Sequence, residues 1–233
     1  DYEQQAQSGK EAFNLAPSPE PADIDLPLMP SLRQAALHIF MAAAAGSELS
    51  LPGQILCDGL IDLIKALNQV GGRLAWDAQG LVSGRAGDGL RFADKVVYAG
   101  EDSLHFYLLS ALALASPGKV KFTGGSGLKL ADLSAWRNTL PAFGARQAHL
   151  VPKSNGLPVH IECSAMFPDS VELPEFTQQD GLVALLLAAP FWETPIKLDG
   201  GANPAWAAAL AEALPVLKSC GVILKPLASS PLT

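Results

Sequence analysis

Residues 96–144 read VVYAGEDSLHFYLLSALALASPGKVKFTGGSGLKLADLSAWRNTLPAFG. A short strand pattern is followed by an apolar stretch of helical length, a second short strand and another helix that ends at Gly144. The apolar stretch has almost no polar face, which is typical of a helix surrounded by protein. The segment therefore predicts an interior helix placed between two strands and followed by a second helix.

The same order occurs in two other parts of the chain. The segment AALHIFMAAAAGSELSL is followed by DGLIDLIKALNQVGG, and GLVALLLAAPFWETPIKL is followed by PAWAAALAEALPVLKSCG. The glycines that close the second helices, Gly71, Gly144 and Gly221, recur about every 75 residues. We predict an α/β (α+β) fold of three repeated β-α-β-α-β-β units around buried parallel helices, with the last strand of the third unit missing or displaced. The expected units are about 26–92, 93–165 and 166–228.

Local signals support these boundaries. Ser31, followed three residues later by Gln34, predicts a capping box for the first helix, and Thr177 followed by Asp180 predicts one for the third interior helix. Turns within RLAWDAQGLVSG and LVPKSNGLPVHIEC predict two hairpins. Residues 1–25 are polar and rich in proline, so we expect a flexible leader or linker there and one folded domain over 26–233.

Composition limits the classes of partner. Sixteen Lys and Arg against 23 Asp and Glu give a net charge of −7, which repels nucleic acid and anionic membranes. The three cysteines are far apart and lack metal-binding spacing, so neither a zinc site nor a disulfide framework is expected. The apolar runs are shorter than the about 20 residues that span a bilayer. We expect a cytoplasmic protein with no cofactor, no nucleic-acid partner and no membrane partner.

The segments IDLPLMPSLRQAALHIFMAAAAG, YAGEDSLHFYLLSALALASPGKVKFTGGSGLKLADL and VELPEFTQQDGLVALLLAAP resemble the enolpyruvyl transferase family, the group of EPSP synthase. The resemblance covers about residues 24–224 and corresponds to one of that family's two globular domains. It implies transfer of an enolpyruvyl group from phosphoenolpyruvate to a phosphorylated sugar-like acid. Such a site needs several Lys and Arg to hold two phosphates and two carboxylates together.

The first two family motifs lack their cations here. The family's L-P-G-S-K-S is matched by LPLMPS, which puts Pro30 or Ser31 at the lysine position, and Arg33 is nearby but out of register. The family's N-A-G-T-A-x-R is matched by GEDSLHF, which puts Phe106 at the arginine position. The resemblance therefore implies that contacts to phosphoenolpyruvate have been lost.

The later motifs are changed in the same direction. The family's R-x-K-E-R-P loop is matched by GLKLAD, where Lys129 is the remaining cation. Its S-S-Q triplet, which holds the phosphorylated substrate, falls at Gln178, Gln179 and Asp180 or one residue earlier, and its K-P-Y is matched by NPAW at 203–206. Each lost charge-assisted contact removes about 1.5–3 kcal/mol. Losing four or five of them abolishes useful affinity for these substrates.

Several residues stay as candidates for contact with a small anionic metabolite. The resemblance implies that the helix N-termini near Ser31, Ser103 and Thr177 lie on one side of the domain, where they can attract an anion. The candidate ligand-facing residues are Ser31, Arg33, Ser103, His105, Lys129, Gln178, Gln179 and Asp180. No catalytic residue and no metal ligand is predicted. Each candidate also has a structural interpretation: the serines and the threonine as helix caps, His105 as a hydrogen-bonded packing residue and Lys129 as a solvated side chain.

Three functions are compatible with this pattern. The first is a domain that has lost enolpyruvyl transfer and serves as a non-catalytic binding or assembly module. The second is a fragment of a divergent 3-phosphoshikimate 1-carboxyvinyltransferase of the shikimate pathway. The third is a different enzyme on a similar unit, resembling RNA 3′-phosphate cyclase, which the acidic charge disfavours. Because a lone domain exposes the face that meets the second domain in the family, we expect a homo-oligomer or a second protein domain as partner.

Overall fold

The computed structural model describes residues 31–54, 56–85 and 87–222. The predicted leader, the strand expected before the first helix and the end of the chain lie outside these residues. The first part of the described chain contains two helices and an antiparallel sheet of order β1-β3-β2. Its elements are α2 (Leu32–Ala45), β1 (Leu49–Leu51), α3 (Asp58–Gln69), β2 (Leu74–Trp76) and β3 (Val82–Gly84).

The second part contains a four-stranded sheet of order β4-β5-β7-β6, in which β4 and β5 are parallel and the other pairs are antiparallel. Its elements are β4 (Val96–Tyr98), α4 (Ser103–Ala113), β5 (Gly118–Thr123), α5 (Ser126–Leu130), α6 (Ser134–Thr139), η2 (Leu140–Phe143), β6 (Ala145–His149) and β7 (Val159–Cys163). The sequence pattern predicted one strand followed directly by one helix here, and the short helix α5 between β5 and α6 was not predicted.

The third part contains a parallel pair of strands and two helices. Its elements are β8 (Ser170–Glu172), α7 (Gln179–Ala188), η3 (Ala189–Phe191), β9 (Lys197–Asp199) and α8 (Trp206–Ser219). The mixed α/β class is confirmed, and the element order follows the predicted units within the described residues. That the three parts are copies of one repeat stays a prediction.

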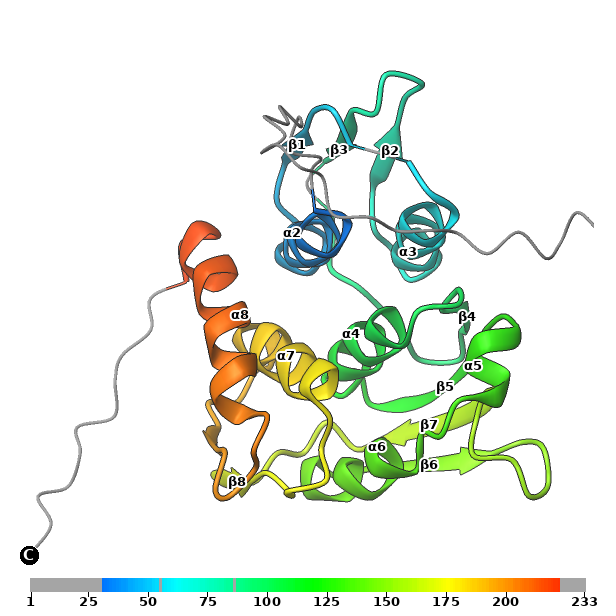
Figure 1. Ribbon diagram of the computed structural model, residues 1–233, viewed down its shortest axis with the longest axis vertical. Coiled ribbons are helices and arrows are strands. Elements are labelled where there is room, and N and C mark those ends of the chain that lie inside the picture. Colours follow the sequence, from blue (N-terminus) through cyan, green and yellow to red (C-terminus); the bar gives the residue numbers. More distant parts are fainter. Residues whose placement is uncertain (1–30, 55, 86, 223–233) are drawn as a thin grey trace, which may run out of the picture.

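The interior is formed by α2, α4 and α7, which contact one another, while α3 packs on α2 and α8 packs on α7 (Figure 1). Every residue of α4 from Leu104 to Ala113 is buried, which agrees with its lack of a polar face. The four-stranded sheet contributes Phe122 to the same core, where its ring meets Phe106 of α4 edge-on at 5.5 Å between centroids. The prediction of buried interior helices is confirmed.

Both hairpins lie where the turn signals placed them. In the first, Asp77 Oδ1 accepts hydrogen bonds from the backbone N–H groups of Gln79 and Leu81, at 2.9 Å each, and β2 pairs with β3. In the second, β6 and β7 pair from Ala145 to His149. The first hairpin packs against α2 and α3, and the second contacts α6 through β6.

Candidate functional site

The first turns of α2, α4 and α7 lie together, as expected from the predicted fold. Arg33 in the first turn of α2 bonds to Asp180 in the first turn of α7, and it lines one cavity together with Asp102 and His105 at the start of α4. The hydroxyl of Tyr107 on α4 donates to Gln178 Oε1 at 2.8 Å, just before α7. This face is therefore where a ligand of the domain would meet three helix N-termini.

The helix caps differ from the prediction at two of the three starts. Ser31 is the N-cap of α2, and its hydroxyl accepts from Gln34 N at 3.3 Å, as predicted. At α4, however, the cap is Asp102, whose carboxylate accepts from Leu104 N at 2.9 Å, so Ser103 is the first helical residue and not a cap. An acidic cap also places negative charge at this helix start.

The prediction that Thr177 caps α7 is also wrong. The N-cap is Gln178, and it makes no side-chain capping bond. The hydroxyl of Thr177 is instead bonded to that of Thr139 at 2.9 Å, in a buried position between α6 and the start of α7. The side chain of Asn203 donates to Thr177 O at 3.0 Å and to Pro174 O at 2.7 Å. The match to the family's K-P-Y motif therefore begins with a residue that holds a loop and not with a ligand-binding cation.

Arg33 is bound by two carboxylates of the third part of the chain. Its Nη2 donates to Asp180 Oδ1 at 2.7 Å and to Glu212 Oε2 at 2.9 Å, and its Nε donates to Glu212 Oε1. The side chains are partly buried, with 38% of Arg33 and 13% of Glu212 exposed. The hydrogen bonds from Arg33 lower the pKa of Glu212, and those from Glu212 and Asp180 raise the pKa of Arg33.

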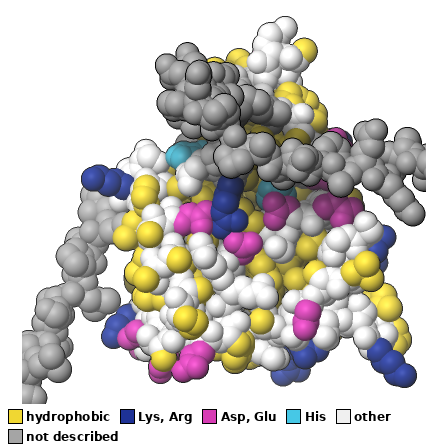
Figure 2. Space-filling model, viewed as in Figure 1, with side chains coloured by type: hydrophobic (Ala, Val, Ile, Leu, Met, Phe, Trp, Pro, Cys, Tyr) yellow, Lys and Arg dark blue, Asp and Glu magenta, His cyan; other side chains and the backbone are white. Residues whose placement is uncertain are grey.

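This cluster changes the electrostatics of the face. Arg33 carries one positive charge and its two partners carry two negative charges, and Gln179 Nε2 also donates to Glu212 Oε2 at 3.3 Å. Figure 2 shows acidic side chains flanking a basic one on this face, over the helices that Figure 1 labels α4 and α7. A cation saturated by two carboxylates has little capacity to bind an external phosphate.

The glycine-rich loop between β5 and α5 is also filled by a side chain of the protein. The carboxylate of Glu101 accepts from Ser126 N at 2.9 Å and from Gly127 N at 2.6 Å. A Cβ at Gly125 would lie 1.7 Å from Glu101 Oε1, so the loop closes tightly around this carboxylate. The backbone N–H groups that an external anion would use are therefore already occupied. Lys129 is exposed on α5 and does not line the cavity beside Arg33.

Phe106, at the position of the family's arginine, is fully buried between the sheet and the neighbouring aromatic rings. It cannot contact a ligand at the open face. Ser31, Gln178 and Gln179 are exposed there, and Ser103 is partly exposed. The face therefore brings together most of the predicted candidates, with Lys129 on a separate element.

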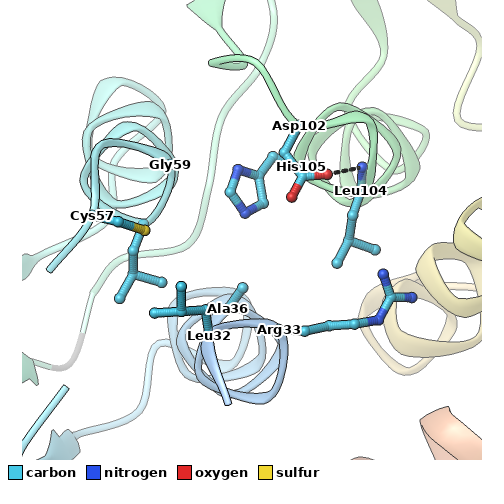
Figure 3. Close-up of a pocket in the computed structure, with 9 residues that line it drawn as sticks. Leu32, Arg33, Ala36, Cys57, Gly59, Asp102, Leu104 and His105 are labelled. Atoms are coloured by element: carbon cyan, nitrogen blue, oxygen red, sulfur yellow. Dashed lines mark hydrogen bonds between the residues drawn. The ribbon is translucent and has the colours of Figure 1, made fainter. Parts of the chain in front are cut away.

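The cavity beside Arg33 has a volume of about 270 Å³ and lies between the starts of α2, α3 and α4 (Figure 3). His105 projects into it, with only 4% of its surface exposed, and its Nδ1 has no hydrogen-bond partner in the part of the chain that the structure describes. Burial lowers the pKa of this imidazole, while Asp102 and Asp62 oppose that shift by their charge. The packing interpretation predicted a hydrogen-bonded His105, and at Nδ1 no described residue makes such a bond.

Sequence reasoning missed several residues of this face. Glu212, Glu101 and Asp102 are absent from the predicted candidates. Cys57 and Gly59 at the start of α3 line the cavity without any recognisable motif. The one usable signal was the acidic pair directly before α4, because Asp is a strong N-cap residue.

Neither a metal-binding cluster nor a membrane-spanning helix is present among the described residues. No set of three or more His, Cys, Asp or Glu side chains is arranged there to hold a metal ion. In the same residues, no helix is long and apolar enough to cross a membrane.

No family model matches the chain. A curated relative, the 3-phosphoshikimate 1-carboxyvinyltransferase 2 of Halalkalibacterium halodurans, is 26% identical over 176 residues, which are 75% of this chain and 38% of the relative. Two solved structures of EPSP synthase from Acinetobacter baumannii match with a TM-score of 0.60 and 17% identity, covering 72% of this chain and 38% of theirs. The chain is EPSP synthase-like.

The resemblance drawn from the sequence motifs is thereby confirmed. The EPSP synthase-like chain spans 38% of the length of the curated relative and of the two solved structures. The two solved structures share the mixed α/β fold of this chain.

Proposed function

We propose that this EPSP synthase-like domain has lost enolpyruvyl transfer and serves as a non-catalytic binding or assembly module in the cytoplasm. One observation carries the proposal. At the face where the helix starts meet, the groups suited to hold anions are occupied by the protein's own carboxylates. Asp180 and Glu212 bind Arg33, and Glu101 binds the N–H groups of the glycine-rich loop.

The physical reason is competition at high effective concentration. A carboxylate fixed within hydrogen-bond distance occupies its cation without the translational entropy cost that a free ligand must overcome. A phosphorylated substrate would also approach at least three negative charges, from Asp102, Asp180 and Glu212. Both effects weaken the binding of phosphoenolpyruvate and of a phosphorylated acceptor.

A second candidate function rests on the curated relative. The 26% identity to a 3-phosphoshikimate 1-carboxyvinyltransferase favours a fragment of a divergent enzyme of that kind, completed by another domain. In that case Arg33 would exchange its carboxylate partners for substrate when the second domain closes. The two functions differ in whether the isolated chain has any measurable affinity for the substrates.

Isothermal titration with shikimate-3-phosphate in the presence of glyphosate separates them. We expect no saturable heat from this chain, whereas the Halalkalibacterium halodurans relative, titrated in the same buffer, serves as the positive control. Micromolar binding to this chain would contradict the loss of function and favour the divergent enzyme.

A double variant tests the role of the carboxylates directly. Asp180→Asn with Glu212→Gln keeps the size of both side chains and removes the two charges that hold Arg33. We expect this variant to bind inorganic phosphate more tightly than the parent chain does. The matched control is Glu172→Gln, which neutralises an exposed carboxylate on β8 and should leave phosphate binding unchanged.

The assembly part of the proposal concerns the oligomeric state. We expect the open face to meet a second copy or a second protein domain. Sedimentation equilibrium over a wide concentration range checks this expectation. A clean monomer at the highest concentration would rule out self-association.

A further inference from the structure

The cavity at the starts of α2, α3 and α4 has the properties of a small-molecule site. Its volume is about 270 Å³, and Leu32, Ala36, Leu60 and Leu104 supply apolar surface. A dry cavity of about 150 Å³ lined by apolar side chains can hold benzene. There is therefore room for one ring or a similar apolar body together with a polar substituent.

A buried polar group in this cavity lacks a partner. His105 is 4% exposed, and its Nδ1 has no hydrogen-bond partner among the described residues. In Figure 3 the imidazole projects from α4 toward Ala36 and Gly59. Buried polar atoms in native proteins almost always have a hydrogen-bond partner. An unpaired imidazole nitrogen beside a cavity therefore indicates a place where a polar group of a ligand can bind.

The start of α3 adds a second place for a hydrogen bond. Its N-cap is Cys57, whose side chain does not cap the helix, and Gly59 and Leu60 of its first turn line the cavity. The first N–H groups of a helix need acceptors from outside the helix. A ligand oxygen near Gly59 can accept from them while it also bonds to His105.

The charge around the cavity selects against ions. Arg33 is held by Asp180 and Glu212, and Asp102 is part of the wall, so an anion would meet negative charge. Either kind of ion also loses its hydration shell in a cavity whose lining includes Leu32, Ala36 and Leu104. An uncharged ligand avoids both costs.

We propose that this cavity binds a small uncharged molecule with an apolar body and one hydroxyl or amide group that hydrogen-bonds to His105. The ligand class rests on the proposed function, because it requires that the face no longer receives anionic substrates. It names the kind of ligand that a non-catalytic binding module on this fold would take.

Phenol is the probe, since it joins an apolar ring to one hydroxyl group. The full chain, with isotope-labelled histidine, is titrated with phenol, toluene, benzoate and benzylamine, and the imidazole signals of His105 are followed by NMR. We expect saturable shifts of these signals with phenol. Toluene should bind about 5-fold more weakly, because it lacks one neutral hydrogen bond. Benzoate and benzylamine should bind more weakly still.

Three variants sharpen the test. His105→Leu replaces the imidazole by an apolar side chain and removes the hydrogen bond to the ligand. It should weaken phenol binding about 5-fold and leave toluene binding nearly unchanged, as followed by calorimetry. Gly59→Ala adds a methyl group that has room, 3.8 Å from His105 Cε1, and should weaken phenol binding by narrowing the cavity. The control His149→Gln changes a histidine that is bonded to Gly156 O, outside the cavity, and should have no effect.

The possible outcomes separate this inference from the proposed function. If phenol causes no saturable change at His105, water alone satisfies the imidazole and the ligand class is wrong, while failure of shikimate-3-phosphate to bind still supports the loss of transfer. Tighter binding of benzoate or benzylamine than of phenol would also overturn the inference. Micromolar binding of shikimate-3-phosphate overturns the proposed function itself.

Discussion

Replacing Arg33 by glutamine should destabilise the domain through the carboxylates that it leaves behind. Hydrogen bonds between charged groups contribute about 1.5–3 kcal/mol each, whereas exposed ion pairs contribute only about 0–1 kcal/mol. Arg33 lies between these limits, because 38% of its side chain is exposed while its partner Glu212 is 13% exposed. We therefore expect Arg33→Gln to lower the free energy of unfolding by about 2 kcal/mol.

Urea unfolding followed by circular dichroism measures this change. A loss of about 2 kcal/mol corresponds to a fall in melting temperature of about 4–8 °C for a domain of this size. The control is Asp88→Asn, which removes an ion pair with Arg73 in which Asp88 is 87% exposed. The control should change stability by no more than about 0.5 kcal/mol.

A double-mutant cycle then isolates the interaction. Arg33→Gln and Glu212→Gln together should cost about 1 kcal/mol less than the sum of the single changes, because the two side chains bond to each other. Additive effects, or a loss below about 0.5 kcal/mol for Arg33→Gln, would refute the view that this cluster joins α2 to α7 and α8.

The pH dependence supplies an independent check of the same cluster. Arg33 lowers the pKa of Glu212 in the folded protein below its ordinary value of 4.5. The unfolded chain therefore binds a proton first as the pH falls, so this stabilisation is present above pH 4.5 and is lost below it. Arg33→Gln should flatten that part of the stability curve.

Three further predictions concern other parts of the fold. Cys163 is 4% exposed and burial raises the pKa of its thiol to about 12, so a thiol reagent at pH 8 should label the exposed Cys220 at once and Cys163 only after unfolding. Burial likewise raises the pKa of Tyr107 to about 12, so the stability that this hydroxyl contributes below pH 10 should be lost as the pH rises from 10 to 12. The stability of Tyr107→Phe should not show this decrease between pH 10 and 12. Gly125→Ala should destabilise by about 1–3 kcal/mol, because its Cβ would overlap Glu101, whereas in a Glu101→Ala background the same change should alter the stability measured in urea by less than about 0.5 kcal/mol.

The helices and hairpins were predictable because their signals are local. The buried helix α4 followed from a run of apolar residues, and the cap of α2 followed from Ser31 and Gln34. Element order and spacing over the chain then led to the EPSP synthase-like fold. These features depend on residues close together in sequence, which a pattern can record.

The chemistry of the open face was less predictable because it depends on distant partners. Asp180 and Glu212 are 147 and 179 residues from Arg33, and nothing near either carboxylate identifies its partner. The cap at Thr177 was mispredicted for the same reason, since its hydroxyl is bonded to Thr139, 38 residues away. A local capping pattern does not reveal that the threonine hydroxyl is hydrogen-bonded to a residue far away in the sequence.

The carboxylate of Glu101 has a consequence for engineering. It accepts hydrogen bonds from the N–H groups of Ser126 and Gly127, so a carboxylate of the protein occupies the place that an external anion would take. An arginine introduced at Phe106 would enter the aromatic core and still face an occupied loop. Any attempt to rebuild anion binding on this scaffold must therefore begin by removing Glu101, and only then add positive charge.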